Sequence, residues 1–325
     1  MSTTRVPVVG DRGSPRRQVL ALAVMMCLAS VAVGQVPPEA GNGVPYSQNG
    51  ADTCLLCHGF LPAVVELFST RHAVPTDPRG PFGEGQLQCE ACHGPGGLHT
   101  GAVLPGGGRP PMIRFGADSV TPVSEQNATC LGCHESDTGF GWHGGAHDDN
   151  RVSCAGCHTL HAARDPVLGT ATQSQVCYGC HQTQRAASVR PYAHPLREGK
   201  MSCTACHSPH GETAELQLVR QTVNETCYQC HAEKRGPFLW DHAPVAEDCA
   251  LCHTPHGSNH PAMLTQRAPL LCQSCHSQVG HSRIAYDAGD LPAGAPSGFL
   301  LAQSCMNCHS QVHGSNHPSG AKLMR

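Results

Sequence analysis

The chain has 325 residues and a formal net charge of −3, with 36 glycines, 26 prolines and only 4% aromatic residues. This composition does not supply the large apolar core that a chain of this length usually buries. The sequence contains no basic run typical of nucleic-acid binding and no basic amphipathic stretch typical of a membrane surface, so both classes of protein are excluded.

Residues 1–34 have the features of a secretory signal peptide. Three arginines precede an apolar run over residues 19–33, and small residues at 32–34 provide a cleavage site. The run is shorter than the roughly 20 apolar residues of a typical transmembrane helix. Cys27 follows Met26 rather than a small residue, so a lipoprotein site is not indicated. We therefore expect export to the periplasm, with removal of four arginines and one aspartate changing the charge to −6.

Residues 35–52 are rich in proline, glycine and asparagine and are interpreted as an N-terminal arm. Beyond this arm the pattern C-x-x-C-H occurs ten times, and the seven copies from Cys130 to His276 recur at intervals of 22 to 26 residues. The motif cysteines are Cys54, Cys57, Cys89, Cys92, Cys130, Cys133, Cys154, Cys157, Cys177, Cys180, Cys203, Cys206, Cys227, Cys230, Cys249, Cys252, Cys272, Cys275, Cys305 and Cys308. The motif histidines are His58, His93, His134, His158, His181, His207, His231, His253, His276 and His309.

This spacing predicts covalent attachment of haem. Two cysteines three positions apart lie on one side of a helical turn and can form thioethers to the two vinyl groups of one haem. The histidine that follows can then bind the iron as its proximal ligand. Zinc ribbons and disulfides also use C-x-x-C, but neither requires a histidine after every second cysteine. All ten copies have one, so the sequence predicts ten c-type haems, which bacteria attach outside the cytoplasm.

The thirteen remaining histidines decide whether the haem irons are open to substrates. A second strong ligand closes the iron and favours electron transfer over catalysis. In each pair of motifs one histidine stands between the two motifs and another follows the second motif. The predicted distal ligands are His72, His99, His147, His161, His194, His210, His242, His256, His281 and His313. His143 is an alternative to His147, and His260 and His317 are surplus.

A histidine three residues after a proximal histidine projects from the same side of the local chain as that histidine. His256, which follows His253 in this way, can hardly reach the far face of its own haem. We therefore expect it to bind the iron of a neighbouring haem, which would tie successive haems together.

The elements expected from the sequence are short. Residues 62–72 suggest one amphipathic helix, and residues 94–118 an irregular loop. Ser124, Ser174 and Asn224 resemble helix caps before their motifs. Asn127 and Asn224 match the glycosylation sequence N-x-T, but in a bacterial-looking chain we interpret them as helix-start residues.

The predicted fold is a multihaem cytochrome c, mostly irregular and elongated, with short α-helices wrapped around a chain of ten haems and little β-structure. The decahaem domain covers residues 53–325 and can be divided into two pentahaem halves, at about 53–190 and 191–325. Because the polypeptide offers little apolar surface, we expect little folding without haem.

The motifs, the repeated P-H-G at His210 and His256, and the tail CMNCHSQVHGSNHPSG from Cys305 resemble the periplasmic decahaem c-type cytochromes of the DmsE and MtrA type. The resemblance covers residues 51–325. It implies a row of haems with two histidine ligands each, inserted into an outer-membrane β-barrel porin-like protein. The partners so implied are periplasmic or inner-membrane electron-donor or acceptor cytochromes and an extracellular multihaem cytochrome or oxidoreductase.

The leading functional prediction is extracellular electron transfer by a conduit of haems across the outer membrane. One alternative is a soluble periplasmic electron shuttle without a barrel partner. A multihaem reductase is a third alternative, but it needs an open haem, whereas here every motif ends in histidine and enough histidines remain to close every iron. We therefore expect an electron-transfer protein rather than an enzyme.

Overall fold

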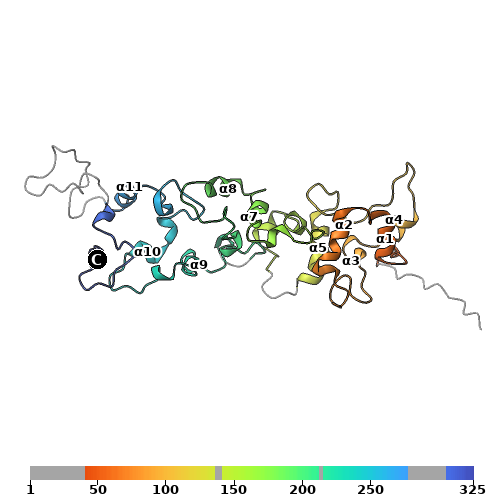
Figure 1. The fold of residues 1–325 in the computed structure, drawn as a ribbon, viewed down its shortest axis with the longest axis horizontal. Coiled ribbons are helices and arrows are strands. Elements are labelled where there is room, and N and C mark those ends of the chain that lie inside the picture. Colours follow the sequence, from red (N-terminus) through yellow and green to blue (C-terminus); the bar gives the residue numbers. More distant parts are fainter. Residues whose placement is uncertain (1–40, 136–140, 212–214, 277–304) are drawn as a thin grey trace, which may run out of the picture. The chain divides into compact units, whose positions relative to one another are not determined.

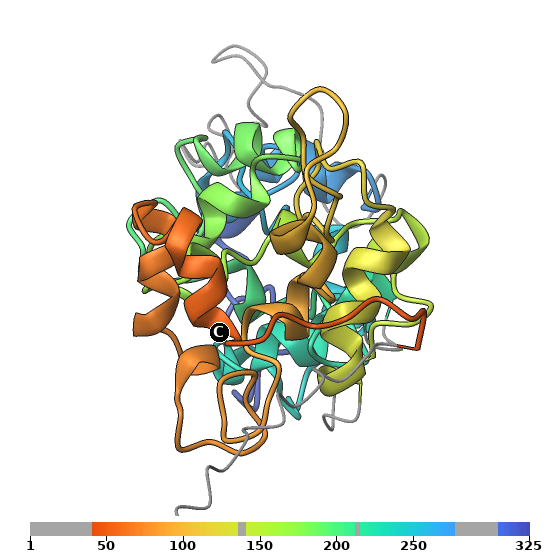
Figure 2. The same ribbon diagram turned by 90° about the vertical axis from the view of Figure 1, so that its right-hand side faces the viewer.

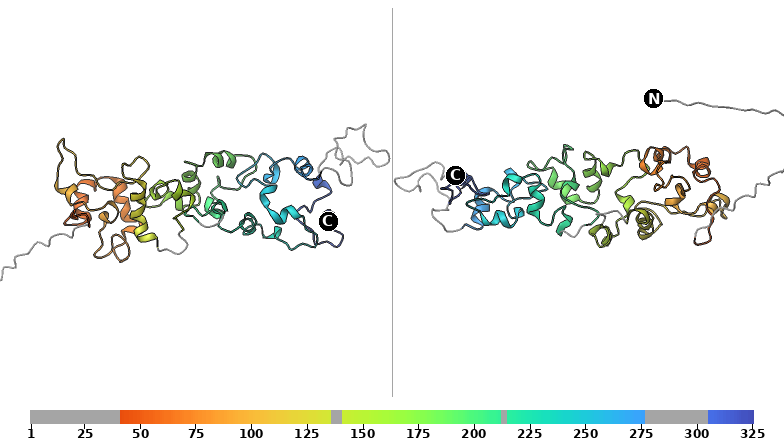
Figure 3. Two further views of the ribbon diagram at one scale, coloured as in Figure 1. Left: turned by 180° about the vertical axis from the view of Figure 1, so that it is seen from behind. Right: turned by 90° about the horizontal axis from the view of Figure 1, so that it is seen from below.

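The computed structural model describes residues 41–135, 141–211, 215–276 and 305–325, and the predicted signal peptide and His281 lie outside these ranges. All of the described residues belong to one compact unit, Pro37–Arg325. Its helices are short and joined by irregular segments (Figures 1, 2 and 3). Within the described ranges there is no strand, and β-structure is limited to isolated bridges such as that between Tyr192 and Ser258. This confirms the prediction of a mostly irregular fold with short helices.

The motifs take two local forms. The first three lie entirely within α-helices, namely α1 (Ala51–His58), α3 (Cys89–His93) and α5 (Val123–His134). Helices α7 (Gln173–Cys177), α9 (Val223–Tyr228) and α11 (Ala268–Gln273) lead into the fifth, seventh and ninth motifs and end within them. The fourth, sixth, eighth and tenth motifs begin with single 3-10 turns, η3 (Cys154–Gly156), η5 (Cys203–Ala205), η8 (Cys249–Leu251) and η10 (Cys305–Asn307).

One hydrogen bond recurs in the motifs from the fourth to the tenth. The backbone N–H of the motif histidine donates to the carbonyl of the first cysteine at 2.9–3.0 Å. This bond closes one helical turn, so both thiols and the imidazole project from the same short segment. The local fold therefore provides the arrangement that thioether attachment and proximal ligation require.

Other short helices connect the motifs: α2 (Pro62–Glu66), α4 (Gly97–Gly101), α6 (Ala146–Asp149), α8 (Gln182–Ser188), α10 (Ala243–Glu247), η1 (Leu67–Ser69), η2 (Arg71–Ala73), η4 (Pro166–Leu168), η6 (Glu215–Gln217), η7 (Ala232–Lys234) and η9 (Pro261–Met263). The expected single helix over residues 62–72 is therefore wrong, because α2, η1 and η2 divide that stretch. The loop over residues 94–118 is irregular as expected, apart from α4. Among the described helices none is long and apolar enough to cross a membrane.

The predicted helix caps are also wrong. Pro122 precedes α5, which places Ser124 and Asn127 inside the helix. Ser174 and Asn224 each occupy the second position of their helices, where they are buried. The side chain of Thr222 caps α9 by accepting a hydrogen bond from the backbone N–H of Glu225. A buried polar side chain needs a hydrogen-bond partner, and the buried side chains of Asn127 and Asn224 find theirs in distant segments of the chain.

Buried apolar side chains are scarce in this unit. Those in the described ranges are Ala51, Ala73, Trp142, Tyr178 and Leu218, and the buried polar or charged residues outnumber them. Ordering a residue costs about 1–2 kcal/mol of backbone entropy, which apolar burial normally offsets. The polypeptide alone supplies little of that burial, so we expect its fold to depend on the haems that the motifs predict.

Candidate haem-binding sites

The two motifs of each pair lie next to each other. The elements that carry them are in contact in all five pairs, as α1 with α3, α5 with η3, α7 with η5, α9 with η8 and α11 with η10. The first cysteines of the two motifs interact directly through their thiols, as Cys54 with Cys89, Cys130 with Cys154, Cys177 with Cys203, Cys227 with Cys249 and Cys272 with Cys305. Two predicted haem attachment points therefore meet in every pair.

Successive pairs approach each other through their second cysteines. The thiols that lie close enough to interact electrostatically are Cys92 with Cys133, Cys157 with Cys180, Cys206 with Cys230 and Cys252 with Cys275. First-cysteine contacts within pairs thus alternate with second-cysteine contacts between pairs. The attachment points follow one another in the order of the sequence, from the first motif to the tenth.

Nine motif histidines face a histidine predicted as a distal ligand. Their ring centres are 5.9–6.4 Å apart in the pairs His58–His99, His72–His134, His93–His161, His147–His181, His158–His210, His194–His231, His207–His256, His242–His276 and His253–His313. Two imidazoles that each place a nitrogen about 2 Å from one shared metal ion have ring centres about 6 Å apart. The nine pairs therefore fit an iron ion between their rings.

The facing histidines always belong to different motifs. His256 lies opposite His207 of the sixth motif and not opposite His253, which it follows in the sequence. His194 lies opposite His231 of the following pair. A histidine between the two motifs of a pair faces a motif of the following pair. A histidine after a pair faces a motif of the preceding pair, except that His99 faces the first motif of its own pair. Each predicted haem site therefore joins two segments of the chain.

The alternative histidines have other neighbours. His147 faces His181, whereas the exposed ring of His143 contacts the carboxylates of Glu135 at 3.3 Å and Asp148 at 3.4 Å. The Nδ1 atom of His317 accepts a hydrogen bond from the backbone N–H of Ser319 at 3.2 Å. No ring contact of His260 is seen within the described part of the chain. His281, the tenth predicted distal ligand, lies outside the described residues, so its assignment remains a prediction.

Hydrogen bonds fix the orientation of many of these rings. The Nδ1–H groups of nine histidines donate to backbone carbonyls at 2.7–3.2 Å, and these histidines are His93, His99, His147, His161, His194, His207, His242, His253 and His309. A histidine that donates from Nδ1 keeps the lone pair of Nε2 free for a metal. The tautomer that these hydrogen bonds favour is therefore the one that iron ligation requires.

Burial also favours the neutral imidazole. Burial lowers the pKa of five predicted distal ligands below the usual histidine value, and neighbouring histidines lower it further; these are His72, His161, His210, His256 and His313. A metal ligand must be unprotonated, so the environment of these side chains matches the role predicted for them.

The P-H-G sequences have a structural reason. The carbonyl of Pro209 accepts the Nδ1–H of His147, and that of Pro255 accepts the Nδ1–H of His194. The glycine that ends the second P-H-G, Gly257, has a φ of +132°, and a Cβ atom there would collide with the backbone oxygen of Ala187. Each P-H-G therefore supplies one facing histidine and orients a second one.

Two buried asparagines hold paired motifs together, and the sequence analysis missed this role. The Asn127 side chain donates to the carbonyl of Val152 at 3.0 Å and accepts the backbone N–H of Cys154 at 2.9 Å. Asn224 likewise donates to the carbonyl of Val245 and accepts the N–H of Cys249 at 2.7 Å. Both asparagines stand three residues before the first cysteine of a motif pair. This shared position is the feature of the sequence that could have indicated their role.

Replacing Asn127 with alanine is expected to destabilise the haem-loaded protein by about 1–3 kcal/mol, because two buried backbone groups would lose their partner. Thermal unfolding followed by far-UV circular dichroism measures this change. Asn150, whose exposed side chain donates to the carbonyl of Ala146, provides the control variant N150A. Equal unfolding temperatures for N127A and N150A would show that the bridge between the motifs does not contribute to stability.

Comparison with known families gives matches to two families. Residues 194–236 and 242–281 match the doubled CXXCH motif, and residues 89–174 match the family described as cytochrome c-type protein NrfB-like. The multiheme cytochrome MtrA of Shewanella baltica is 48% identical over 283 residues, which cover 86% of this chain and 83% of that protein. The cytochrome c-type protein NrfB of Haemophilus influenzae is 29% identical over 120 residues, or 36% of this chain and 50% of that protein.

The short-helical fold, the paired motifs and the facing histidines define a multihaem c-type cytochrome with covalently attached haems, which is a class of electron-transfer protein. The identity and its coverage are high enough to assign the family. The chain belongs to the MtrA family of multihaem cytochromes.

Proposed function

We propose that the chain carries ten c-type haems, each ligated by two histidines, and conducts electrons along them from one side of the bacterial outer membrane to the other. The observation that carries this proposal is the set of nine facing histidine pairs, which combine a metal-compatible spacing with attachment cysteines in sequence order. The tenth site is assigned by its motif at Cys305 to His309, with His281 predicted as the second ligand.

Haem, when bound, supplies a one-electron couple of ferric and ferrous iron. The residues of this chain determine how that couple is used. The cysteines fix each attachment point beside the next one, as with Cys227 and Cys249. With haem attached, the two facing histidines of a pair would both bind the iron and leave no place for a substrate, which supports electron transfer over reductase activity.

We further propose that the protein acts in the periplasm and within an outer-membrane β-barrel partner. The signal-like residues 1–34 support export, and membership of the MtrA family supports the barrel partner. Electron-carrier cytochromes on the periplasmic side and a multihaem cytochrome or oxidoreductase on the outside would then be its redox partners.

Affinity purification of the tagged protein from a detergent-solubilised outer-membrane fraction tests this placement. We expect mass spectrometry to identify a β-barrel protein in stoichiometric amount. Recovery from the soluble periplasmic fraction alone would favour a shuttle and exclude the conduit. The ferric protein should also be entirely low-spin, and a high-spin haem in the unaltered protein would contradict the proposed ligation.

A further inference from the structure

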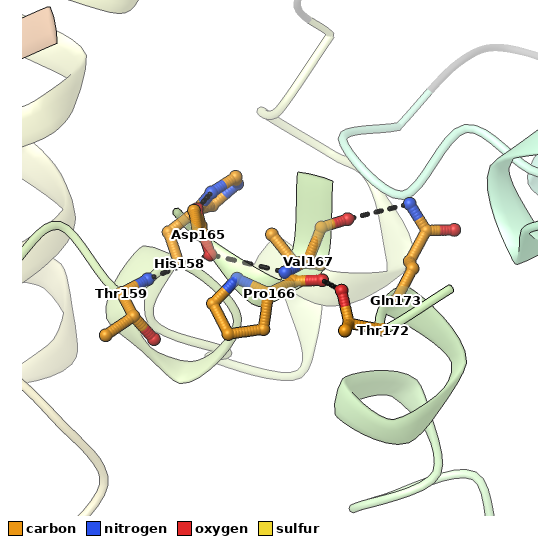
Figure 4. A network of polar contacts seen from close by, with 7 residues as sticks. All are labelled: His158, Thr159, Asp165, Pro166, Val167, Thr172 and Gln173. Atoms are coloured by element: carbon orange, nitrogen blue, oxygen red, sulfur yellow. Dashed lines mark hydrogen bonds and ion pairs between the residues drawn. The ribbon is translucent and has the colours of Figure 1, made fainter. Parts of the chain in front are cut away.

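One motif histidine has a different hydrogen-bond acceptor from its counterparts. In four of the five motif pairs the histidine of the second motif donates its Nδ1–H to a backbone carbonyl at 2.7–3.1 Å; these are His93, His207, His253 and His309. In the remaining pair His158 donates to the Oδ2 atom of Asp165 at 2.7 Å (Figure 4). A carboxylate therefore replaces a neutral amide oxygen at the fourth motif.

The path of the chain after the motif explains why a carboxylate replaces the backbone carbonyl as the acceptor. After the sixth and eighth motifs the acceptor lies nine residues beyond the histidine, at Leu216 and Ala262, both of which have positive φ angles. After the fourth motif the chain turns back two residues earlier. Asp165 stands there at the start of η4, where Pro166 follows it. The turn therefore presents a side chain to the imidazole instead of a backbone group.

The carboxylate is held firmly in this position. Its Oδ1 atom accepts the backbone N–H groups of Thr159 at 3.2 Å and Val167 at 3.3 Å, while Oδ2 accepts from His158. Thr172 and Gln173 brace the same turn by donating to the carbonyls of Pro166 and Val167 (Figure 4). With both oxygens engaged, Asp165 has a defined orientation toward the ring.

The negative charge of Asp165 is directed at the imidazole. The side chains of Asp165 and His158 are only 11% and 28% exposed, so water screens their interaction weakly. No lysine or arginine in the described ranges forms an ion pair with Asp165. Hydrogen bonds to an ionised acceptor are shorter and stronger than those to a neutral one, and they make a histidine a more basic metal ligand.

We propose that Asp165 tunes one haem of the chain: through His158 it lowers the reduction potential of the haem attached to Cys154 and Cys157. This inference rests on the proposed ligation of that haem by His158 and His210. A more basic ligand and a nearby negative charge both stabilise ferric over ferrous iron. The step concerned is transfer of one electron from an adjacent haem, with no bond or proton exchanged.

A site of lowered potential affects the chain as a whole. Electrons that pass from the third to the fifth haem in the order of the attachment sites would occupy the fourth one, which Asp165 makes harder to reduce than a neutral acceptor would. The fourth haem should therefore be reduced at a lower potential than it would be without Asp165. Asp165 thus influences how electrons distribute between the haems before the fourth site and those after it.

The test is the substitution Asp165→Asn in the haem-loaded, full-length protein. Asparagine has the same size and can also cap η4, but it carries no charge. We expect the equilibrium constant for reduction of one haem to rise at least tenfold, which corresponds to about 59 mV for one electron. Redox titration of the visible spectrum measures this shift, and one low-spin ferric signal should move in the electron paramagnetic resonance spectrum.

Asp248→Asn is the matched control. Asp248 also precedes a 3-10 turn, η8, and accepts the backbone N–H of Ala250 at 2.7 Å, but it does not bond a motif histidine. It lies directly before Cys249, so its substitution removes a charge near a haem without changing a ligand hydrogen bond. We expect all low-spin signals of this variant to match those of the unaltered protein.

The outcomes separate this inference from the proposed function. If Asp165→Asn keeps every haem and all signals and potentials are unchanged, the tuning role is overturned while the electron-transfer proposal stands. A high-spin haem in the unaltered protein would instead contradict the ligation itself. If the asparagine variant loses haem, Asp165→Ser, which is also uncharged and can cap η4, is measured in its place: a shifted signal of one haem supports the inference, and an unshifted spectrum overturns it.

Discussion

Replacing His256 with alanine is expected to convert one haem of the protein to the high-spin state while all ten haems stay attached. His256 faces His207 with ring centres 6.0 Å apart and planes 14° from parallel. The affected haem is therefore that of the sixth motif, which keeps its cysteines and its proximal histidine. Loss of the sixth ligand opens one axial position to water or an added ligand.

The measurement combines electron paramagnetic resonance with mass spectrometry. A high-spin ferric signal should appear at the expense of one low-spin haem, and the mass should show no loss of haem. Cyanide should restore the low-spin state by binding to the open iron. The control is His260→Ala, because His260 lies four residues away and lacks a facing histidine in the described part of the chain. A spectrum that stays low-spin in the His256 variant would remove His256 from the set of ligands.

The attachment chemistry could be predicted from the sequence because it is local. Five consecutive residues supply both thioether cysteines and the proximal histidine, and the structure adds only the hydrogen bond that closes the turn, as from His158 to Cys154. The mostly irregular fold could also be predicted, since the frequent glycines and prolines and the scarcity of apolar residues prevent long regular elements.

The partner of each histidine could not be predicted because the pairing depends on the path of the chain. His93 and His161 are 68 positions apart, and His253 and His313 are 60 apart. Counting the spare histidines identified candidates without indicating which motif each one faces. The choice between His143 and His147 was open for the same reason, because both stand between the same two motifs.

The roles of Asn127 and Asp165 were not predicted from the sequence, for two different reasons. Asn127 stands three residues before a motif cysteine, so its local context suggested a helix start, whereas it lies inside α5 and its buried amide bonds a segment 25 residues away. Asp165 belongs to no motif, and only the turn after His158 brings the two side chains together.

Preventing haem attachment is expected to abolish the fold. Of the described residues, only five apolar side chains are buried, while large apolar residues such as Leu56 and Phe60 are 85% and 78% exposed. The short helices cannot persist alone, because helices of fewer than about 12 residues are marginal in water. Attached haems would supply the apolar surface that offsets the chain entropy, and each facing histidine pair would add a link between distant segments.

Expression without the signal residues 1–34, in a cytoplasm that lacks haem attachment, provides the haem-free chain. We expect it to show the circular dichroism of an unfolded protein and to be digested at least tenfold faster by protease than the haem-loaded chain. The matched control is the same truncated sequence directed to the periplasm by a foreign signal in cells with the attachment machinery. A haem-free chain that resists protease and unfolds cooperatively would contradict the view that haem is the core. Since the facing histidines are up to 68 positions apart, as with His93 and His161, their arrangement can form only as the haems bring these segments together.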